Sequence, residues 1–542
     1  MKRRQVLQQF SALMPAAALP AWAQMASAAP AAPRGAFQPS WESLTTYQTP
    51  EWFRDAKFGI WAHWGPQCQP EFGDWYAREM YIEGSAKNRH HVATYGHPSV
   101  YGFKEVIRDW KAERWEPEEL VGLYKRAGAR YFMAMANHHD NFDLFASRHH
   151  AWNSTRIGPK QDIIKRWAAA ARAQGLPLGV SVHAAHAWTW YEPAQRADTQ
   201  GPLAGVPYDG RLRQEDGRGQ WWEGLDPQQL YAQDHAPSAD AHDPKAIHRQ
   251  WDWGEGASKP SEAYCRNFLA RTLDLLDQHR PELVYFDDTA LPLWPVSPVG
   301  LDIAAHLYNQ HLDKTGRTQA VLFGKILDEQ QRRAMVWDIE RGQAQGIEPL
   351  PWQTDTCLGA WHYDKRVLER GQYKSAETVI RMLIDVVSKN GNLLLNVPVK
   401  GDGSIDAVER RVVEAIGVWM QAHGESIYGT RPWRVFGEGP AMDKQAPLTA
   451  QGFNEGKGAP LGAADFRFTA RGDIVFASGF AAPEGDRALI RSLARGRHRP
   501  VQRVDLLGGA QALRFQQRDD GLEVQLPAGG VAGLPAYVLR IA

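Results

Sequence analysis

The chain has 542 residues, with 62 Lys and Arg against 62 Asp and Glu, and 43% of its residues are hydrophobic. This composition is typical of a globular protein and excludes a disordered or fibrous chain. The balanced charge gives no diffuse basic field for nucleic acid, so we expect function to reside in a local site. The 22 Trp and 19 His suit a protein that stacks sugar rings, although packing of indoles in a core explains them equally well.

The first 23 residues have the pattern of a bacterial export signal. Lys2, Arg3 and Arg4 precede an alanine-rich apolar stretch that ends in the small-x-small sequence at residues 21–23. The paired arginines favour a twin-arginine route and leave a general secretory route open. We therefore expect a signal peptide over residues 1–23 and a periplasmic or secreted mature protein. No later apolar run reaches the roughly 18 residues that a membrane span needs, and the three Cys exclude a disulfide scaffold.

From about residue 40 to residue 430, short β-type apolar runs alternate with helical patterns. Strands are predicted at residues 58–62, 131–135, 178–182, 283–286, 321–323, 335–339 and 393–397. Helices are predicted at residues 117–127, 162–174, 261–279, 375–389 and 407–423. Alternation on this scale predicts an α/β fold with a parallel sheet, and a (β/α)8-like barrel has the right size.

Two further regions differ from this pattern. Residues 188–260 are rich in Gly, Pro, Asp and Gln but also contain six Trp, so we expect an ordered excursion near the mouth of the barrel. Residues 432–542 contain short alternating runs separated by Gly and Pro turns. These runs predict a C-terminal antiparallel β-sandwich, with strands at 465–469, 473–477, 501–507, 522–526 and 537–541.

Several predicted barrel strands end directly in residues that can carry chemistry. These residues are His63, the Asn-His-His-Asp run at 137–140, the pair Asp287 and Asp288, and Glu340. The carboxyl ends of barrel strands ring one mouth, where barrel enzymes have their active sites. The sequence has no P-loop, dinucleotide fingerprint or nucleophile elbow. Carboxylates with imidazoles and indoles are the set that glycoside hydrolysis uses.

Four motifs, in order along the chain, resemble those of the α-L-fucosidases of glycoside hydrolase family 29. They are WFRDAKFGIWAHWG at 52–65 followed by Asp-Trp-Tyr at 74–76, HHDNF at 138–142 leading to Trp-Asn-Ser at 152–154, Tyr-Phe-Asp at 285–287, and SKNGNLLLNV at 388–397. The resemblance spans roughly residues 40–430. It implies a catalytic (β/α)8-like barrel followed by a β-sandwich, and an activity that requires no metal or organic cofactor.

The resemblance also implies which carboxylates react. Asp287 matches the family's nucleophile, while the adjacent Asp288 is expected on the opposite face of the strand as a capping or orienting group. Glu340, in Trp-Asp-Ile-Glu-Arg at 337–341, matches the acid/base residue, with Glu329 and Glu348 as rivals. Retaining chemistry requires the two carboxyl groups to lie about 5 to 5.5 Å apart.

Other positions match residues that hold the sugar in the family. His63, His138 and His139 match groups that bind fucose hydroxyls, and imidazole suits this because one nitrogen donates while the other accepts. Metal binding by the His pair is the competing interpretation, although a closed site needs about four ligands. Trp75 and Trp361 match indoles at the pocket.

Three positions depart from the family pattern. Asp74 stands where the family usually has Glu, Lys325 is the nearest equivalent of an Arg, and His183 stands in place of a Tyr contact. Despite these departures, the resemblance implies a retaining exo-α-L-fucosidase that removes terminal fucosyl residues from glycans by double displacement. An α-L-galactosidase-like activity and a catalytically silent carbohydrate-binding relative stay open as alternatives.

Overall fold

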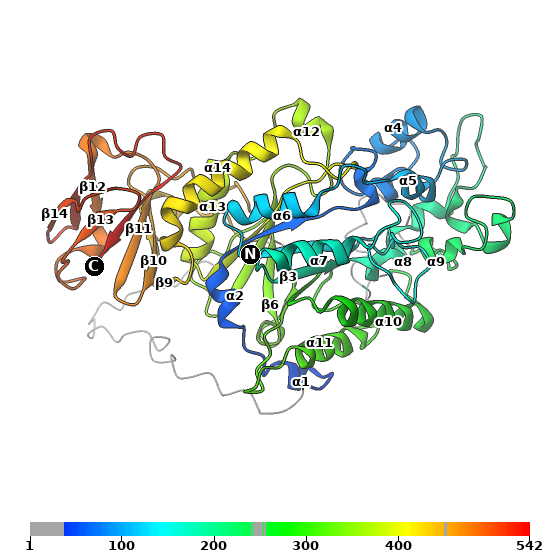
Figure 1. Cartoon of the computed structure of the whole chain (residues 1–542), viewed down its shortest axis with the longest axis horizontal. Helices are drawn as coiled ribbons and strands as arrows, with labels where there is room; N and C mark the ends of the chain where they lie inside the picture. Colours follow the sequence, from blue (N-terminus) through cyan, green and yellow to red (C-terminus); the bar gives the residue numbers. More distant parts are fainter. Residues whose placement is uncertain (1–36, 240, 242–252, 254–255, 449–451) are drawn as a thin grey trace, which may run out of the picture.

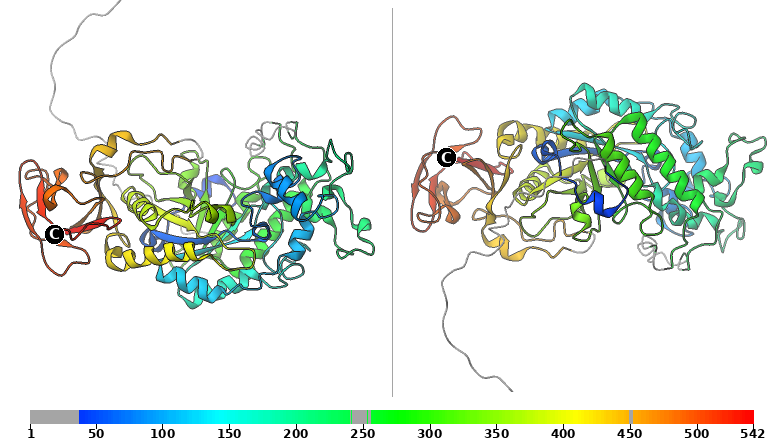
Figure 2. Two further views of the ribbon diagram at one scale, coloured as in Figure 1. Left: turned by 90° about the horizontal axis from the view of Figure 1, so that it is seen from above. Right: turned by 90° about the horizontal axis from the view of Figure 1, so that it is seen from below.

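The computed structural model describes residues 37–239, 241, 253, 256–448 and 452–542. The predicted signal peptide and Trp251 lie outside the described residues. A barrel occupies the middle of the molecule, with a β domain at one end and residues 187–239 at the other (Figures 1 and 2).

Eight parallel strands form a closed barrel in the order of the sequence. Strand β1 pairs with both β2 and β8, which closes the sheet. The predicted barrel is thereby confirmed, and the seven predicted strands all occur. The strands are β1 Phe58–Ala62, β2 Tyr131–Asn137, β3 Leu178–Val182, β4 Leu283–Phe286, β5 Val321–Gly324, β6 Val336–Glu340, β7 Trp352–Cys357 and β8 Gly391–Asn396.

Strand β7 was not predicted, because its residues do not look like a buried strand. Gln353, Thr354, Asp355 and Thr356 are all buried in it. Hydrogen bonds compensate for much of this burial. Gln353, for example, donates to Asp338 at 2.8 Å and accepts from the Tyr131 hydroxyl at 2.8 Å. The barrel interior therefore contains a polar network that apolar periodicity cannot reveal.

The five predicted helices lie around the barrel. They are α6 Pro117–Arg126, α7 Ile163–Ala173, α10 Glu262–His279, α13 Ala376–Ser388 and α14 Ala407–His423. The last four begin after side-chain N-caps that accept a backbone N–H, namely Asp162, Ser261, Ser375 and Asp406. Helix α11 Val299–Gln310 was not predicted. The remaining α-helices of the barrel region are α1 Trp41–Leu44, α2 Glu51–Ala56, α3 Tyr76–Glu79, α4 Ala86–Thr94, α5 Phe103–Asp109, α8 Ala187–Trp190, α9 Pro227–Tyr231 and α12 Lys365–Glu369.

The chain forms no α-helix in the connections from β5 to β7, where residues 325–351 are all described. A segment from beyond the barrel approaches there instead. Gly452 forms a parallel bridge with Glu340, and the Phe453 N–H donates to the Glu340 carbonyl at 2.9 Å. A Cβ at Gly452 would lie 2.3 Å from that carbonyl oxygen, so only glycine allows this approach.

The segment after β3 packs against the loop that follows β2. The Tyr191 hydroxyl donates to the Asp140 carbonyl at 3.2 Å, and the Trp152 indole donates to the Asp226 carbonyl at 2.8 Å. Trp190 and Trp222 are buried within it. Trp190 and Trp222 therefore pack in a folded segment beside the β2 loop.

The C-terminal region forms two antiparallel sheets with a hydrophobic core between them, which confirms the predicted sandwich. One sheet has the order β13-β16-β11-β10-β9 and the other β12-β15-β14. Arg467 of β10 reaches the barrel, where its Nε contacts Asp385 of α13 at 2.5 Å. The strands are β9 Arg431–Glu438, β10 Phe466–Arg471, β11 Ile474–Gly479, β12 Arg487–Ile490, β13 Val504–Leu506, β14 Arg514–Gln517, β15 Leu522–Gln525 and β16 Tyr537–Ile541. Within the described ranges, no helix is long and apolar enough to cross a membrane.

Candidate active site

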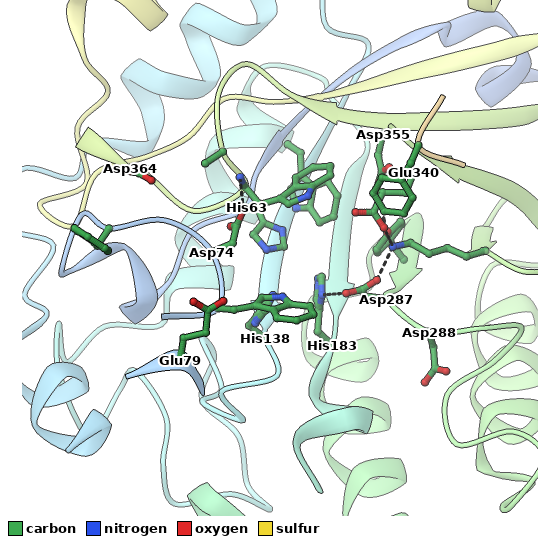
Figure 3. A pocket seen from close by; sticks show the side chains of 18 of the residues that line it. His63, Asp74, Glu79, His138, His183, Asp287, Asp288, Glu340, Asp355 and Asp364 are labelled. Atoms are coloured by element: carbon green, nitrogen blue, oxygen red, sulfur yellow. Dashed lines mark hydrogen bonds and ion pairs between the residues drawn. The ribbon is translucent and has the colours of Figure 1, made fainter. Parts of the chain in front are cut away.

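A cavity of about 450 Å³ opens at the carboxyl ends of the barrel strands. Figure 3 shows most of its side chains, and all the lining residues except Phe453 come from strands β1 to β7 and from the segments that follow them. Trp61 and Tyr285 lie among the aromatic residues of its wall, and Asp287, Lys325 and Glu340 also line it. Ring faces and charged groups converge on one space, as a sugar-binding pocket requires.

Asp287 lies immediately after β4, and three groups contact its carboxylate. Lys325 Nζ is 2.5 Å from Oδ1, while His139 Nε2 and His183 Nδ1 are 3.1 and 3.3 Å from Oδ2. Burial alone would raise the pKa of Asp287, but the Lys325 ammonium and the two imidazoles hold it well below its ordinary value. Asp287 is therefore an ionised carboxylate in the pocket.

Lys325 also contacts the predicted acid/base residue. Its Nζ lies 2.5 Å from Glu340 Oε2, so one ammonium bridges two carboxylates (Figure 3). Because both oxygens contact the same nitrogen, they lie no more than about 5 Å apart. Burial opposes the positive charge, yet Asp287 and Glu340 raise the pKa of Lys325 well above its ordinary value.

The two rival acids lie elsewhere. Glu329 is exposed and does not line the cavity. Glu348 is half-buried, also lies outside the cavity lining, and forms an ion pair with Arg332 at 3.4 Å. Of these three candidates, only Glu340 meets Asp287 in the pocket.

Asp288 points away from Asp287, as expected for adjacent residues on a strand (Figure 3). Its Oδ1 accepts the Thr289 N–H at 2.7 Å and lies 3.1 Å from His186 Nε2. No helix begins there, so Asp288 stabilises the turn after β4 and the position of His186.

His63, His138 and His183 line the cavity, whereas His139 is fully buried behind Asp287. Burial lowers the pKa of His63 and His138 well below the ordinary value, and lowers that of His183 to about 4 although Asp287 opposes the shift. These imidazoles are therefore neutral near pH 7, and each can donate one hydrogen bond and accept another.

The tautomer of His138 follows from its neighbour Gln67. The Gln67 Oε1 accepts the Ala77 N–H at 3.3 Å, so its Nε2 is the atom that donates to His138 Nδ1 at 2.8 Å. His138 then carries its proton on Nε2. Its free edge is a donor, which suits a sugar hydroxyl oxygen.

Among the residues that the structure describes, two groups of three imidazoles could hold a metal ion. They are His63, His138 and His362, and His138, His139 and His183, with nitrogen atoms within 4.8 Å of one another in each group. Both groups need His138, and the tautomer fixed by Gln67 leaves it no free lone pair on Nε2. The donor set in this arrangement therefore fits hydroxyl groups better than a metal ion.

Asp74 lies at the cavity, but its carboxylate binds the protein. It accepts the Trp361 N–H at 3.2 Å and the His362 N–H at 2.6 Å, and it lies 3.1 Å from His362 Nδ1. Asp74 therefore fixes the loop that carries Trp361, whose ring lies 5.7 Å from that of His63. Trp75, in a left-handed conformation, completes this side of the cavity.

Several residues in or beside the pocket were not predicted from the sequence, among them Asp355, His362 and Phe453. Asp355 lies on the unpredicted strand β7, His362 is buried behind His63 and His138, and Phe453 comes from beyond the barrel. A polar strand and a residue more than fifty positions beyond the last motif, which ends at residue 397, give no periodic signal. The sequence Trp-His-Tyr at 361–363 was a local sign of His362, but the motif predicted only Trp361 at the pocket.

Comparison with known proteins identifies the family of this chain. The α-L-fucosidase family model matches residues 23–425. The chain belongs to the α-L-fucosidase family. Together with its relatives, this makes it a glycoside hydrolase, as the motifs predicted.

Several characterised relatives agree with this assignment. The tissue α-L-fucosidase of Rattus norvegicus is 24% identical over 410 residues, which are 74% of each chain. The plasma α-L-fucosidase of Homo sapiens is 24% identical over 429 residues, 73% of each chain. Among solved structures, the Thermotoga maritima α-fucosidase in complex with fucose has a TM-score of 0.66 at 23% identity, covering 93% of this chain and 100% of its own. Isoenzyme 1 from Paenibacillus thiaminolyticus has a TM-score of 0.62 at 19% identity, covering 91% and 98%. At these identities the structures support the fold.

Proposed function

We propose that this protein is a retaining exo-α-L-fucosidase that removes terminal α-L-fucosyl residues from glycans by double displacement. The observation that carries the proposal is the Lys325 bridge, which limits the Asp287 and Glu340 oxygens to about 5 Å apart. A separation of about 5 to 5.5 Å is that of retaining enzymes, whereas inverting enzymes need about 6.5 to 9.5 Å to admit a water.

The roles follow from the charges around each carboxylate. Asp287 is ionised and attacks the anomeric carbon, while Glu340 protonates the leaving oxygen. In the second half, Glu340 removes a proton from water, which attacks the glycosyl-enzyme and frees Asp287. Lys325 contacts both carboxylates at rest, so it must release Glu340 when the glycosidic oxygen arrives. His63, His138, His183, Trp75 and Trp361 are proposed to hold the sugar.

The test follows product stereochemistry and activity together. Wild-type protein is expected to hydrolyse 4-nitrophenyl α-L-fucoside, and NMR of the first-formed sugar is expected to show the α-anomer. Asp287→Ala should lose about 10³-fold or more in kcat, whereas Asp288→Asn, altered at the adjacent carboxylate, should keep most of it. Release of the β-anomer, or unchanged activity in Asp287→Ala, would refute the mechanism.

Two outcomes would favour the alternatives. Absence of turnover in the wild type together with fucose binding would indicate a silent carbohydrate-binding relative. Faster hydrolysis of the matching α-L-galactoside would indicate a pocket that accepts a hydroxyl at C6. A parallel assay with Glu340→Ala and Glu348→Ala tests the acid/base assignment, and only the first is expected to lose activity.

We also propose export to the periplasm or medium, because the basic start and the small-x-small pattern of residues 1–23 support a signal peptide. Expression of the full chain in a bacterial host, followed by N-terminal sequencing of the mature protein, tests this. An unprocessed N-terminus in the cytoplasmic fraction would contradict it.

A further inference from the structure

A third carboxyl lies directly beside the two proposed catalytic ones. Asp355 on β7 is the register partner of Glu340 on β6, and its side chain lines the same cavity (Figure 3). Neighbouring strands lie about 4.8 Å apart, and paired residues point to the same face of the sheet. Asp355 and Glu340 are therefore adjacent in the barrel interior.

The contacts of Asp355 differ from those of Glu340. Glu340 forms an ion pair with Lys325, whereas Asp355 Oδ2 accepts a hydrogen bond from the Tyr285 hydroxyl at 2.9 Å. The other oxygen of Asp355 is buried and has no hydrogen-bond partner among the described residues. A buried carboxyl oxygen without a partner is costly as part of an anion and cheap as part of a neutral acid.

The surrounding charges also favour a proton on Asp355. Strands β4, β5 and β6 contribute the titratable groups that face it, while its partner on β8 is the apolar Leu394. The Lys325 ammonium attracts Asp287 and Glu340 as well as Asp355, so its positive charge is shared among these carboxyl groups. The facing groups are Tyr285, Asp287, Lys325, Asp338 and Glu340. Burial raises the pKa of Asp355 to about 7, with Glu340 and Asp287 adding to the shift and Lys325 and Tyr285 opposing it.

We propose that Asp355 acts through Glu340. At rest Asp355 holds the proton that Glu340 later delivers to the leaving oxygen. This inference rests on the proposed function, and it assigns a role to a residue outside the nucleophile and acid/base pair. At rest Asp355 Oδ2 contacts the Tyr285 hydroxyl and Glu340 Oε2 contacts Lys325. When the glycosidic oxygen displaces Lys325, the Glu340 carboxylate turns to the adjacent Asp355 carboxyl and takes its proton.

The proton balance closes over one turnover. Glu340 gives the proton to the leaving oxygen as the C1–O bond breaks and a bond from Asp287 to C1 forms. Water then loses a proton to Glu340 as its oxygen attacks C1 and the bond from Asp287 to C1 breaks, which restores the Asp287 carboxylate. The proton on Glu340 returns to Asp355. No other reactant is needed.

The leaving group distinguishes this role from a structural one. Asp355→Asn keeps the shape but cannot release a proton, so kcat on phenyl α-L-fucoside should fall by about 10²-fold. Turnover of 2,4-dinitrophenyl α-L-fucoside, whose leaving group needs little protonation, should fall by less than about threefold. The alkaline limb of the wild-type kcat/KM profile, expected near the Asp355 pKa of about 7, should disappear.

Tyr285→Phe provides a second variant that keeps the acid. Removing the hydroxyl that donates to Asp355 should move the alkaline limb upward by about 0.5 to 1 pH unit, the equivalent of about one hydrogen bond. Asp338→Asn is the matched control, because burial and Asp355 raise the pKa of Asp338 well above its ordinary value, so the replacement removes no charge. It is expected to keep the wild-type limb.

An activity-independent measurement completes the test. Infrared spectra of the wild type should show a carboxyl band that titrates near pH 7 and is missing in Asp355→Asn. An equal loss on both substrates, or an alkaline limb unchanged in Tyr285→Phe, would overturn the role of Asp355. A wild type that hydrolyses neither fucoside would instead refute the proposed function, whatever the infrared result.

Discussion

Replacing Lys325 by Met removes the single cation between two carboxylates while keeping a side chain of similar length. The repulsion between the Asp287 and Glu340 oxygens, which lie no more than about 5 Å apart, would then no longer be offset, and at an effective dielectric constant of about 20 it is at least about 3 kcal/mol. That energy corresponds to about 2 pH units. Because catalysis requires an ionised nucleophile, the acid limb of kcat/KM should move upward by this amount.

The assay is a pH profile of kcat/KM on 4-nitrophenyl α-L-fucoside for the wild type, Lys325→Met and Lys325→Arg. The Arg variant keeps the charge and should keep the acid limb within about 0.5 pH unit, with a change in kcat from its different geometry. Thermal unfolding of each variant at the same pH separates misfolding from electrostatics. An acid limb in Lys325→Met that coincides with the wild type would show that the bridge does not control the ionisation of Asp287.

Two further predictions concern the loop that carries Trp361 and a buried ion pair that stabilises the fold. Asp74→Ala should raise KM by about tenfold with a smaller effect on kcat, because it frees the loop that carries Trp361. Arg271→Met should lower the free energy of unfolding by about 3 to 5 kcal/mol at neutral pH, because it leaves Asp143 buried and unpaired. Arg271 holds the pKa of Asp143 below its ordinary value against the effect of burial, so the ion pair stabilises the fold above about pH 4 and is lost as the pH falls.

Each of these two predictions has a measurable outcome that would contradict it. A proportional loss of kcat with unchanged KM in Asp74→Ala would mean that this carboxylate acts on the reaction itself. For Arg271→Met, the difference in unfolding free energy from the wild type should shrink in acid. A difference that is constant between pH 7 and pH 3 would indicate lost packing as the cause.

The barrel could be predicted because most of its strands are apolar runs and four of the five predicted helices begin at side-chain caps. Strand β7 was not predicted because Gln353, Thr354 and Asp355 hydrogen-bond to groups on other strands, and these partners cannot be identified before the sheet closes. Local pattern predicts elements whose stability is local or apolar. It does not predict polar strands that depend on contacts distant in sequence.

The candidate site shows the same division. Asp287 and Glu340 follow recognisable strand ends, and the structure brings them together. The sequence placed Asp74 at the sugar, yet its carboxylate contacts backbone N–H groups of a loop nearly three hundred residues away. Which polar group faces the ligand, and which supports another group, depends on loop packing that motifs alone do not specify.

The bridge between Gly452 and Glu340 has a consequence for recombination between relatives. Phe453 lines the pocket although it lies beyond the barrel, and the backbone that carries it is hydrogen-bonded to the proposed acid/base strand. A chimera that exchanges sandwich domains at about residue 430 would also exchange this part of the pocket rim. Crossovers placed after Phe453 keep the rim with its own barrel, whereas earlier ones should alter the choice of aglycone along with the domain.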